Sequence, residues 1–150
     1  MATQLKDFAT PVVAVVEPDT TAHVVAQLMR QHHIGAMVVV DAAEKSRPVG
    51  ILTDRDLVLG LMAEGLDPAL FTAGDIMSVS LVLARPEMDA ADAVRLMKEN
   101  QVRRLILVDE QGRLVGILSM EDLLEPLTRE LAALAAGMAG ARDREIRQRK

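Results

Sequence analysis

An internal repeat is the feature that most constrains the fold of this chain. Residues 18–41 match residues 86–109 at a shift of 68, and the run Val-Gly-Ile-Leu occurs at 49–52 and again at 115–118, a shift of 66. Two extra residues in one loop of the first copy account for the difference, and a loop insertion of this size costs little free energy. We therefore expect two similar units packed together.

Each copy predicts the same order of elements, β-α-β-β-α. A short β-rich run at residues 12–16, and again at 79–84, ends at a Pro that cannot continue a ladder. A helix follows, capped by Thr20 or Thr21 in the first copy and by Asp89 in the second, with apolar residues at helical spacing.

Continuous apolar runs come next, at residues 37–40 and 105–108, and they favour strands that are buried on both faces. The remaining expected elements are turns at 41–47 and 109–112, strands at 48–52 and 113–118, and helices that begin near Asp54 and Met120. Neither small sheet can cover its apolar faces alone. We therefore predict an α/β (α+β) fold in which two β-α-β-β-α units pack about a pseudo-twofold axis.

Composition excludes several kinds of chemistry. Half of the 150 residues are hydrophobic, yet there is no Cys, Trp or Tyr and there are only two Phe. The absence of Cys excludes disulfides, thiolate metal sites and a Cys nucleophile. The net charge of −5 and the scarcity of aromatic rings argue against nucleic acid as a partner. The three histidines offer no metal-ligand spacing with paired acids.

Membrane and secretory signals are also missing. No apolar run approaches the roughly 18–20 residues that cross a bilayer. Residues 1–10 lack the basic start and apolar stretch of a secretory signal. We expect a cytoplasmic protein with no membrane partner.

One motif is similar to an enzyme signature. Asp54-Arg55-Asp56-Leu57-Val58 follows an apolar strand, as does the motif of haloacid-dehalogenase-like enzymes, whose first Asp is a nucleophile. The second copy has Met120 at that place and keeps only the second acid. A repeat that keeps the second acid and drops the first favours binding, so we expect no enzyme.

The shared motifs resemble a tandem pair of CBS (cystathionine β-synthase) domains. They are Gly50–Asp56, Gly116–Asp122, the lead-in Asp75-Ile76-Met77-Ser78 and Val102-Arg103-Arg104-Leu105. The resemblance covers roughly residues 8–128. It divides the chain into a first repeat at 8–66, a second repeat at 72–128, and a helical tail at 129–150 whose end we expect to be disordered.

The resemblance implies a regulatory module that binds an adenine-containing ligand in the cleft between the repeats. The candidate ligands are AMP, ADP, ATP, NAD and S-adenosylmethionine, as regulators and not as required cofactors. The implied site residues are Thr53 and Asp56 facing Arg103, Arg104 and Leu105, then Ser119 and Asp122 facing Gly35, Ala36 and Met37, with Arg55 as a further phosphate contact. The resemblance also implies a homodimer, and a separate, unidentified effector protein would read the response.

The residue types suit such a ligand. Thr53 and Ser119 stand where a strand meets a helix, and the free N–H groups and helix dipole there favour an anion. Asp56 and Asp122, one turn later, can accept hydrogen bonds from the hydroxyls of a ribose. The guanidinium groups at 103–104 offer forked donors to phosphate. Because only the second copy has this Arg-Arg pair, we expect unequal pockets.

Simpler interpretations of the same residues stay open. The motifs at 53–56 and 119–122 both fit N-terminal capping boxes, which satisfy only the N–H groups of their own helices. The arginines at 103–104 could be solvated charges, or partners of Glu99 and Asp109. The alternative function is a constitutive dimerisation or scaffold module that binds no ligand.

The C-terminal segment predicts an additional helix. Leu127, Leu131, Leu134 and Met138 recur at intervals of four, three and four residues, which is typical of a helix with a narrow apolar stripe. Such a helix either folds back on its own domain or contacts a second copy or a partner. Its Arg-rich end, residues 142–150, offers the remaining route to nucleic acid.

Overall fold

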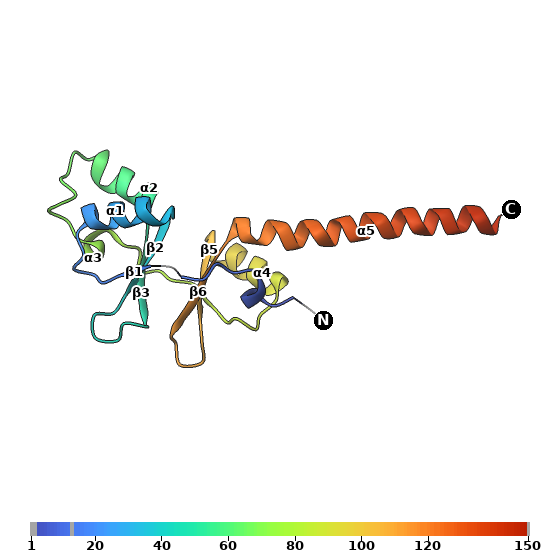
Figure 1. Ribbon diagram of the computed structural model, residues 1–150, viewed down its shortest axis with the longest axis horizontal. Coiled ribbons are helices and arrows are strands. Elements are labelled where there is room, and N and C mark those ends of the chain that lie inside the picture. Colours follow the sequence, from blue (N-terminus) through green and yellow to red (C-terminus); the bar gives the residue numbers. More distant parts are fainter. Residues whose placement is uncertain (1–2, 13, 150) are drawn as a thin grey trace.

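The computed structural model describes residues 3–12 and 14–149 (Figure 1). Met1, Ala2, Val13 and Lys150 lie outside the described residues, so the parts of the N-terminal segment, first expected strand and tail that fall on them are not covered. The elements in chain order are η1 (Leu5–Asp7), β1 (Val15–Val16), α1 (Ala22–His32), β2 (Ala36–Val40), β3 (Pro48–Thr53), α2 (Asp54–Leu57), the π-helical η2 (Val58–Met62), α3 (Ala73–Ile76), β4 (Leu83–Ala84), α4 (Ala90–Asn100), β5 (Arg104–Val108), β6 (Leu114–Ser119) and α5 (Met120–Gln148).

Two three-stranded sheets carry the two repeats. Their strand orders are β1-β2-β3 and β4-β5-β6, and in each sheet the first pair is parallel and the second antiparallel. The register repeats as well, because Val39 lies opposite Gly50 in one sheet and Leu107 lies opposite Gly116 in the other. The predicted fold of two β-α-β-β-α units is confirmed.

The first strand of each repeat is shorter than the sequence predicts. We expected strands over residues 12–16 and 79–84, whereas β1 and β4 contain two residues each. Each of them pairs with one neighbour only, in parallel. Thr10 and Ser78, which precede the two expected strands, pair with the other repeat.

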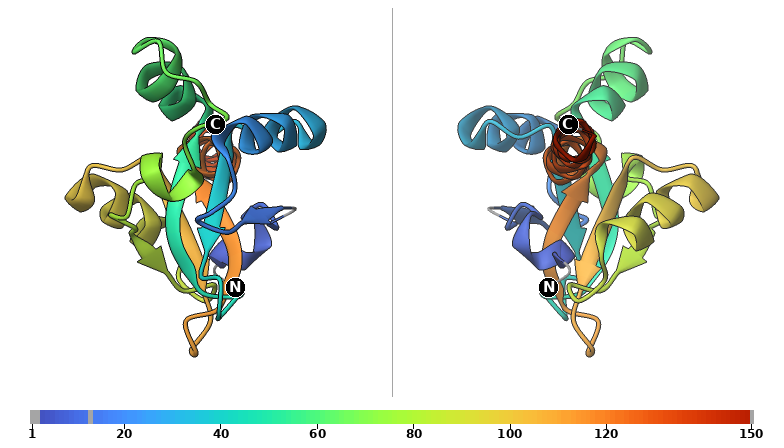
Figure 2. Two further views of the ribbon diagram at one scale, coloured as in Figure 1. Left: turned by 90° about the vertical axis from the view of Figure 1, so that its left-hand side faces the viewer. Right: turned by 90° about the vertical axis from the view of Figure 1, so that its right-hand side faces the viewer.

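These preceding residues form two crossing segments, residues 4–12 and 72–80, that join the repeats. Thr10 makes two backbone hydrogen bonds with Ile117, of 3.0 and 3.1 Å, and Ser78 makes two with Ile51, of 3.0 and 2.9 Å. The two bridges are equivalent under the repeat, so they express the pseudo-twofold relation. Figure 2 shows the strands of both repeats at the centre, with α1 and α4 on opposite sides.

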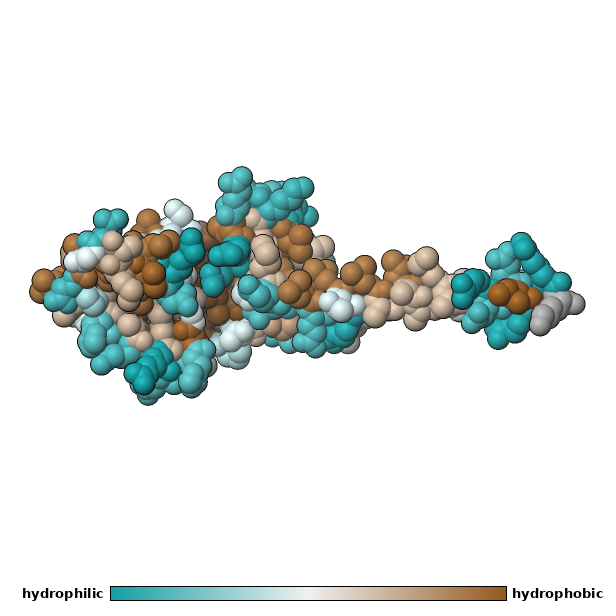
Figure 3. All heavy atoms as spheres, turned by 90° about the horizontal axis from the view of Figure 1, so that it is seen from above, coloured by the Kyte–Doolittle hydropathy of each residue, from teal (hydrophilic) through white to brown (hydrophobic). Residues whose placement is uncertain are grey.

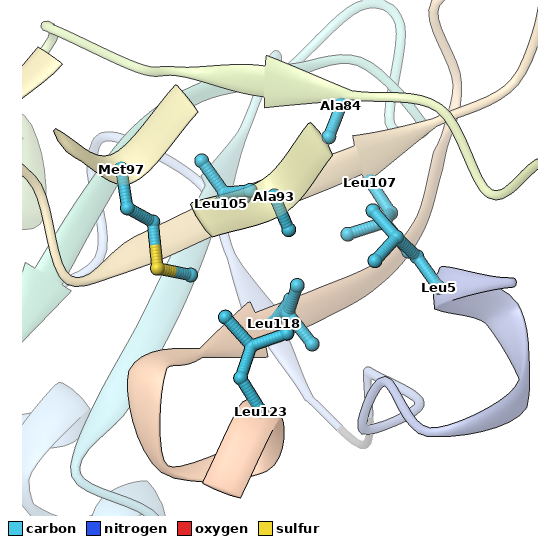
Figure 4. Close-up of a cluster of buried hydrophobic side chains, with 8 residues drawn as sticks. All are labelled: Leu5, Ala84, Ala93, Met97, Leu105, Leu107, Leu118 and Leu123. Carbon is cyan, nitrogen blue, oxygen red and sulfur yellow. The ribbon is translucent and has the colours of Figure 1, made fainter. Parts of the chain in front are cut away.

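Each repeat has an aliphatic core to which the crossing segment of the other repeat contributes. Leu5 of η1 is fully buried in the second core, where the side chains converge (Figure 4). In the first core Ala73 of α3 takes the equivalent place. A third cluster joins the two sheets and consists of Val38, Val40, Ile106 and Val108. The two repeats are therefore held together by shared apolar burial as well as by backbone pairing.

Helix α5 is unbroken over 29 residues. It includes the end of the tail that we expected to be disordered, as far as Gln148. Every residue from Thr128 to Arg149 is exposed, and the helix projects away from the two repeats (Figure 1). Among the described residues, no helix combines the length and the apolar character that crossing a bilayer requires.

Candidate functional site

A cleft of about 230 Å³ lies where the two repeats meet, and both repeats line it. Ile51 and Thr53 come from the end of β3, in the first repeat. Residues 101–104, between α4 and β5, come from the second. The remaining lining residues are Ser78, Ser80, Leu81, Val82 and Ile106.

Thr53 ends β3 and caps α2. Its Oγ1 accepts a hydrogen bond from the N–H of Asp56 at 3.2 Å, and Oδ2 of Asp56 accepts one from the N–H of Thr53 at 2.9 Å. Ser119 and Asp122 form the same reciprocal pair at the start of α5, at 3.3 and 2.9 Å. The capping interpretation therefore applies at both motifs. The box at Thr53 leaves the hydroxyl hydrogen and Oδ1 of Asp56 uninvolved, whereas the hydroxyl of Ser119 also interacts with the side chain of Glu121.

The arginine pair brings positive charge to this cleft. Arg104 is half-buried at the start of β5, and Arg103 beside it is exposed. Asp109, a partner that the sequence offered, pairs instead with Arg113 at 2.8 Å. Within the part of the chain that the structure describes, no carboxylate lies within 4.0 Å of either guanidinium group. The positive charge is thus not neutralised by a close ion pair.

The positive charges of both arginines affect the pKa of Glu121, which lies in the first turn of α5. Its pKa is lowered first by its own backbone N–H and then by the hydroxyl of Ser119, and more weakly by the positive charges of Arg104 and Arg103. Glu121 is therefore ionised at neutral pH, and its negative charge offsets part of the positive potential at the cleft.

The symmetry-related cleft on the other side is much smaller, about 40 Å³. Its lining residues are Thr10, Pro11, Val12, Ala14, Ile34, Ala36, Val38 and Ile117. Under the repeat, Ala36 occupies the place of Arg104, and Val12 that of Ser80. Among the described residues, no charged side chain lines the smaller cleft, so the two clefts differ in both volume and charge.

Two residues expected at the ligand site lie elsewhere. The side chain of Met37 is fully buried in the first core, because alternate residues of β2 face that core, so it cannot contact a ligand at the surface. Arg55 lies on an outer face of α2 beside Val58 and Leu59. Successive helical residues are rotated by about 100°, which turns Arg55 away from the face of Thr53. Neither Met37 nor Arg55 is among the described residues that line the two clefts.

The residues expected around the smaller cleft are only partly brought together. Ala36 lines it, whereas Ser119 and Asp122 do not. Gly35 lies against α2 of its own repeat, where a Cβ would stand 3.1 Å from the carboxylate of Asp54. The N–H of Asp54 also donates to the carbonyl of Gly35 at 2.9 Å. Gly35 therefore serves a local close approach between β2 and α2.

Three polar cleft residues are absent from the sequence prediction: Ser78, Ser80 and Gln101. Gln101 follows α4 in the left-handed conformation, with φ of 54°. The two serines belong to a crossing segment, whose partner strand lies in the other repeat. The lead-in motif that ends at Ser78 was the one available signal for them.

A larger groove, of about 370 Å³, runs between the start of α4 and α5. Asp89, Arg129 and Glu130 line it, so its charged groups have both signs. The second repeat and Thr3 form this groove, whereas both repeats form the cleft. Among the described residues there is no group of three His, Asp or Glu side chains that could hold a metal ion.

The chain is similar to known proteins along most of its length. The family model for the CBS domain matches it twice, at residues 5–63 and 73–129. Uncharacterized protein MK0525 of Methanopyrus kandleri is 42% identical over 108 residues, which are 72% of this chain and 54% of MK0525, so the match spans about half of that protein. The CBS domain-containing protein YhcV of Bacillus subtilis is 43% identical over 119 residues, 79% of this chain and 81% of YhcV.

Solved structures agree with the sequence match. Hypoxic Response Protein I, solved with two coordinated zinc ions, superposes with a TM-score of 0.69 at 34% identity, covering 82% of this chain and 98% of that one. CBSX2 of Arabidopsis thaliana, in complex with AMP, gives a TM-score of 0.67 at 27% identity, covering 84% and 96%. The repeated family match and the two superposable sheets show that this chain belongs to the CBS domain family and is a tandem CBS pair.

Proposed function

We propose that this protein is a non-enzymatic regulatory module that binds an adenine nucleotide, or a related adenosyl ligand, between its two CBS repeats. CBS pairs are regulatory modules, and the similar CBSX2 has been solved with AMP. The observation that carries the proposal is the composition of the cleft. Thr53 from one repeat and residues 103–104 from the other line a single hollow of about 230 Å³.

We assign the phosphate of the ligand to the side of the cleft that carries the positively charged arginines. Arg103 and Arg104 line the cleft, and no carboxylate of a described residue pairs with them. A guanidinium group binds a phosphate through two parallel N–H donors. The hydroxyl hydrogen of Thr53 is not used by its capping box and can donate to a phosphate oxygen. Together these groups favour an anionic ligand over a neutral nucleoside.

We assign the nucleoside of the ligand to the rest of the cleft, away from the arginines. Asp56 is not among the lining residues of the cleft but is paired with Thr53, which is. The capping box uses Oδ2 of Asp56 and leaves Oδ1 to accept a hydrogen bond from the ribose hydroxyl of a ligand that extends past Thr53. The aliphatic side chains of Ile51, Val82 and Ile106 offer dispersion contacts to a flat base. The backbone of residues 78–82 supplies hydrogen-bonding groups to the edge of the base.

The response would pass through the packing of the repeats. A ligand held by both repeats favours the arrangement in which they stand closest, and a separate effector protein would recognise that arrangement. We propose that the working unit is a cytoplasmic homodimer. Exposed apolar side chains on the outer helices favour such association, notably Val24, Val58, Met62 and Val94.

One observation favours a second function, a constitutive dimerisation or scaffold module without ligand. Both hydroxyl and carboxylate pairs already satisfy the N-termini of their own helices. In that account the capping boxes only stabilise the N-termini of their helices, and the two arginines are solvent-exposed charges that bind no ligand.

Isothermal titration of nucleotide-free protein with AMP, ADP, ATP, NAD and S-adenosylmethionine separates the two functions. The sensor predicts saturable binding of at least one ligand, weakened by Asp56→Ala and unaffected by Asp122→Ala. The second variant is a matched control, because Asp122 forms the equivalent capping box with Ser119, whereas Asp56 is paired with Thr53, which lines the larger cleft. A scaffold predicts no saturable heat with any of the five, while the dimer persists.

A further inference from the structure

We propose that α5 pairs two copies of this protein in antiparallel orientation. The contact surface is the α5 stripe, defined as Leu124, Leu127, Leu131, Leu134 and Met138. Its members follow one another at intervals of three, four, three and four residues. The proposal does not depend on ligand binding, so each can fail while the other stands.

Most of the stripe is exposed in a single chain. The side chains of Leu131, Leu134 and Met138 are 67%, 64% and 68% exposed. Figure 3 shows hydrophobic side chains along the projecting helix, whose far end is mostly polar but also carries a hydrophobic side chain. Gly137 and Gly140 lower the helix propensity of the same stretch. A projecting helix of this composition gains stability chiefly by packing its apolar face against a partner.

The spacing identifies what kind of partner fits. Alternating intervals of three and four residues keep a seam aligned along a second helix, with each side chain inserted between those of its neighbour. The flanks of the seam carry Ala135 and Gly137, which are small enough to let two helices approach closely. The stripe therefore fits a helix of the same kind, which a second copy supplies.

Charge sets the orientation of the pair. Residues 121–130 contain four acidic side chains and one Arg, a net charge of −3, whereas residues 142–149 contain four Arg and two acids, a net charge of +2. Antiparallel pairing brings the acidic start of one helix to the basic end of the other. Parallel pairing brings like charges together, which is unfavourable.

In one antiparallel register the centre of the stripe and the opposite charges both match, whereas Leu127 and Leu124 lie opposite Glu145 and Gln148. With Leu134 of one copy opposite Met138 of the other, Leu131 lies opposite Ala141, and Glu130 lies opposite Arg142. Because α5 projects away from the repeats, this arrangement places the two bodies at opposite ends of the helix pair (Figure 1).

The oligomeric state of the full chain tests the contact. Sedimentation equilibrium should give half the wild-type mass for Leu131→Gln/Leu134→Gln/Met138→Gln. The matched control, Ala132→Gln/Ala136→Gln/Ala139→Gln, makes the same number of changes on the opposite face and should keep the wild-type mass. Unchanged thermal unfolding would show that the stripe variant is folded. Equal masses for wild type and a folded stripe variant would overturn the proposal. That result would mean that the stripe folds onto its own chain or remains unpaired.

Cross-linking tests the orientation, helped by the absence of cysteine from the chain. A short bismaleimide should link Leu131→Cys chains to Ala141→Cys chains in a mixture, and should link Leu131→Cys chains to one another weakly. Mass spectrometry of the linked peptides identifies the pair. A predominant link between two Leu131→Cys chains indicates parallel helices and contradicts the proposal. Absence of any link contradicts the contact itself.

Discussion

Gly50 and Gly116 occupy the same position in the two repeats, and the chain packs closely over both. A Cβ at Gly50 would collide with the side chain of Met77, and one at Gly116 would stand 3.4 Å from the carbonyl oxygen of Thr10. Met77 and Thr10 belong to the two crossing segments. The repeated glycines therefore keep β3 and β6 open to the backbone of the other repeat.

We predict that Gly50→Ala lowers the free energy of unfolding by about 1–3 kcal/mol, the usual cost of overpacking a close contact. Urea denaturation measures the change. Gly60→Ala is the control, because a Cβ there meets nothing within 4 Å. The two variants should differ clearly in the urea concentration at the midpoint of unfolding. Equal midpoints would show that Met77 moves aside without a cost in stability.

The capping boxes yield a prediction that separates structure from binding. Thr53→Ala and Ser119→Ala each remove one N-cap oxygen and should each lower the free energy of unfolding by about 1 kcal/mol. Only Thr53 lines the larger cleft, so only Thr53→Ala should also weaken nucleotide affinity. Thermal melts and ligand titration of the same two variants give both readouts. Equal effects on affinity would remove Thr53 from the ligand site.

Local motifs could be predicted from the sequence because their partners are three or four residues away. Both capping boxes are of this kind, as are the helix starts at Thr21 and Asp89. The sequence does not show that Met37 faces the first core or that Arg55 lies on an outer face of α2, because the surface that a side chain faces depends on packing, which the spacing of motifs does not define.

At the scale of the elements, an Asp organises the turn between the last two strands of each repeat. Asp41 accepts hydrogen bonds from the N–H groups of Ala43 and Glu44, at 2.8 and 2.9 Å. Asp109 accepts them from Gln111 and Arg113, at 3.0 and 2.9 Å. These bonds stabilise the ionised carboxylate, and they hold the turns that align β2 with β3 and β5 with β6.

These turns predict that the stability of the protein depends on pH. The pKa of Asp109 is lowered from 3.8, chiefly by the N–H of Arg113 and also by its guanidinium group. The folded state therefore prefers the ionised form, and this stabilisation is present above the ordinary pKa and is lost as pH falls through the lowered one. We expect Asp109→Asn to lower Tm at neutral pH, and the difference from wild type to shrink below pH 3.8.

Thermal melts across that range measure the effect, with Glu99→Gln as a charge-matched control on the surface of α4. A difference in Tm that is constant with pH would contradict the assignment.

The pairing of the crossing segments could not be predicted from sequence patterns. Residues 4–12 and 72–80 pair with strands more than twenty residues away, in the other repeat. Periodicity reports which face of an element is buried, but not which distant strand it joins. This is why β1 and β4 were expected to be longer, and why Ser78 and Ser80 were absent from the predicted site.

At the scale of the whole molecule, near-symmetric repeats enclose two different clefts. The larger, of about 230 Å³, includes two arginines, whereas the smaller, of about 40 Å³, includes none. The repeat sequence anticipated this asymmetry, because one copy has Arg103–Arg104 where the other has Gly35–Ala36. The difference in volume adds a steric reason, to which Pro11 and Val12 contribute.

We therefore predict one nucleotide for each chain. The smaller cleft offers neither the volume for a base nor a cation for phosphate, so a second site should stay empty at concentrations that saturate the first. The stoichiometry from titration, with protein concentration fixed by amino-acid analysis, measures this number. Two equivalent sites for each chain would show that the smaller cleft opens when ligand binds.

The most direct test of the central claim is titration of Arg103→Ala/Arg104→Ala with whichever adenine ligand binds wild-type protein most tightly. Arg30→Ala/Arg95→Ala is the control, because it removes the same charge from exposed faces of α1 and α4. The account predicts saturable binding to wild type and to the control, and at least a tenfold loss of affinity in the cleft variant, about 1.4 kcal/mol. Equal affinity in all three proteins, or no binding to any of them, would contradict it.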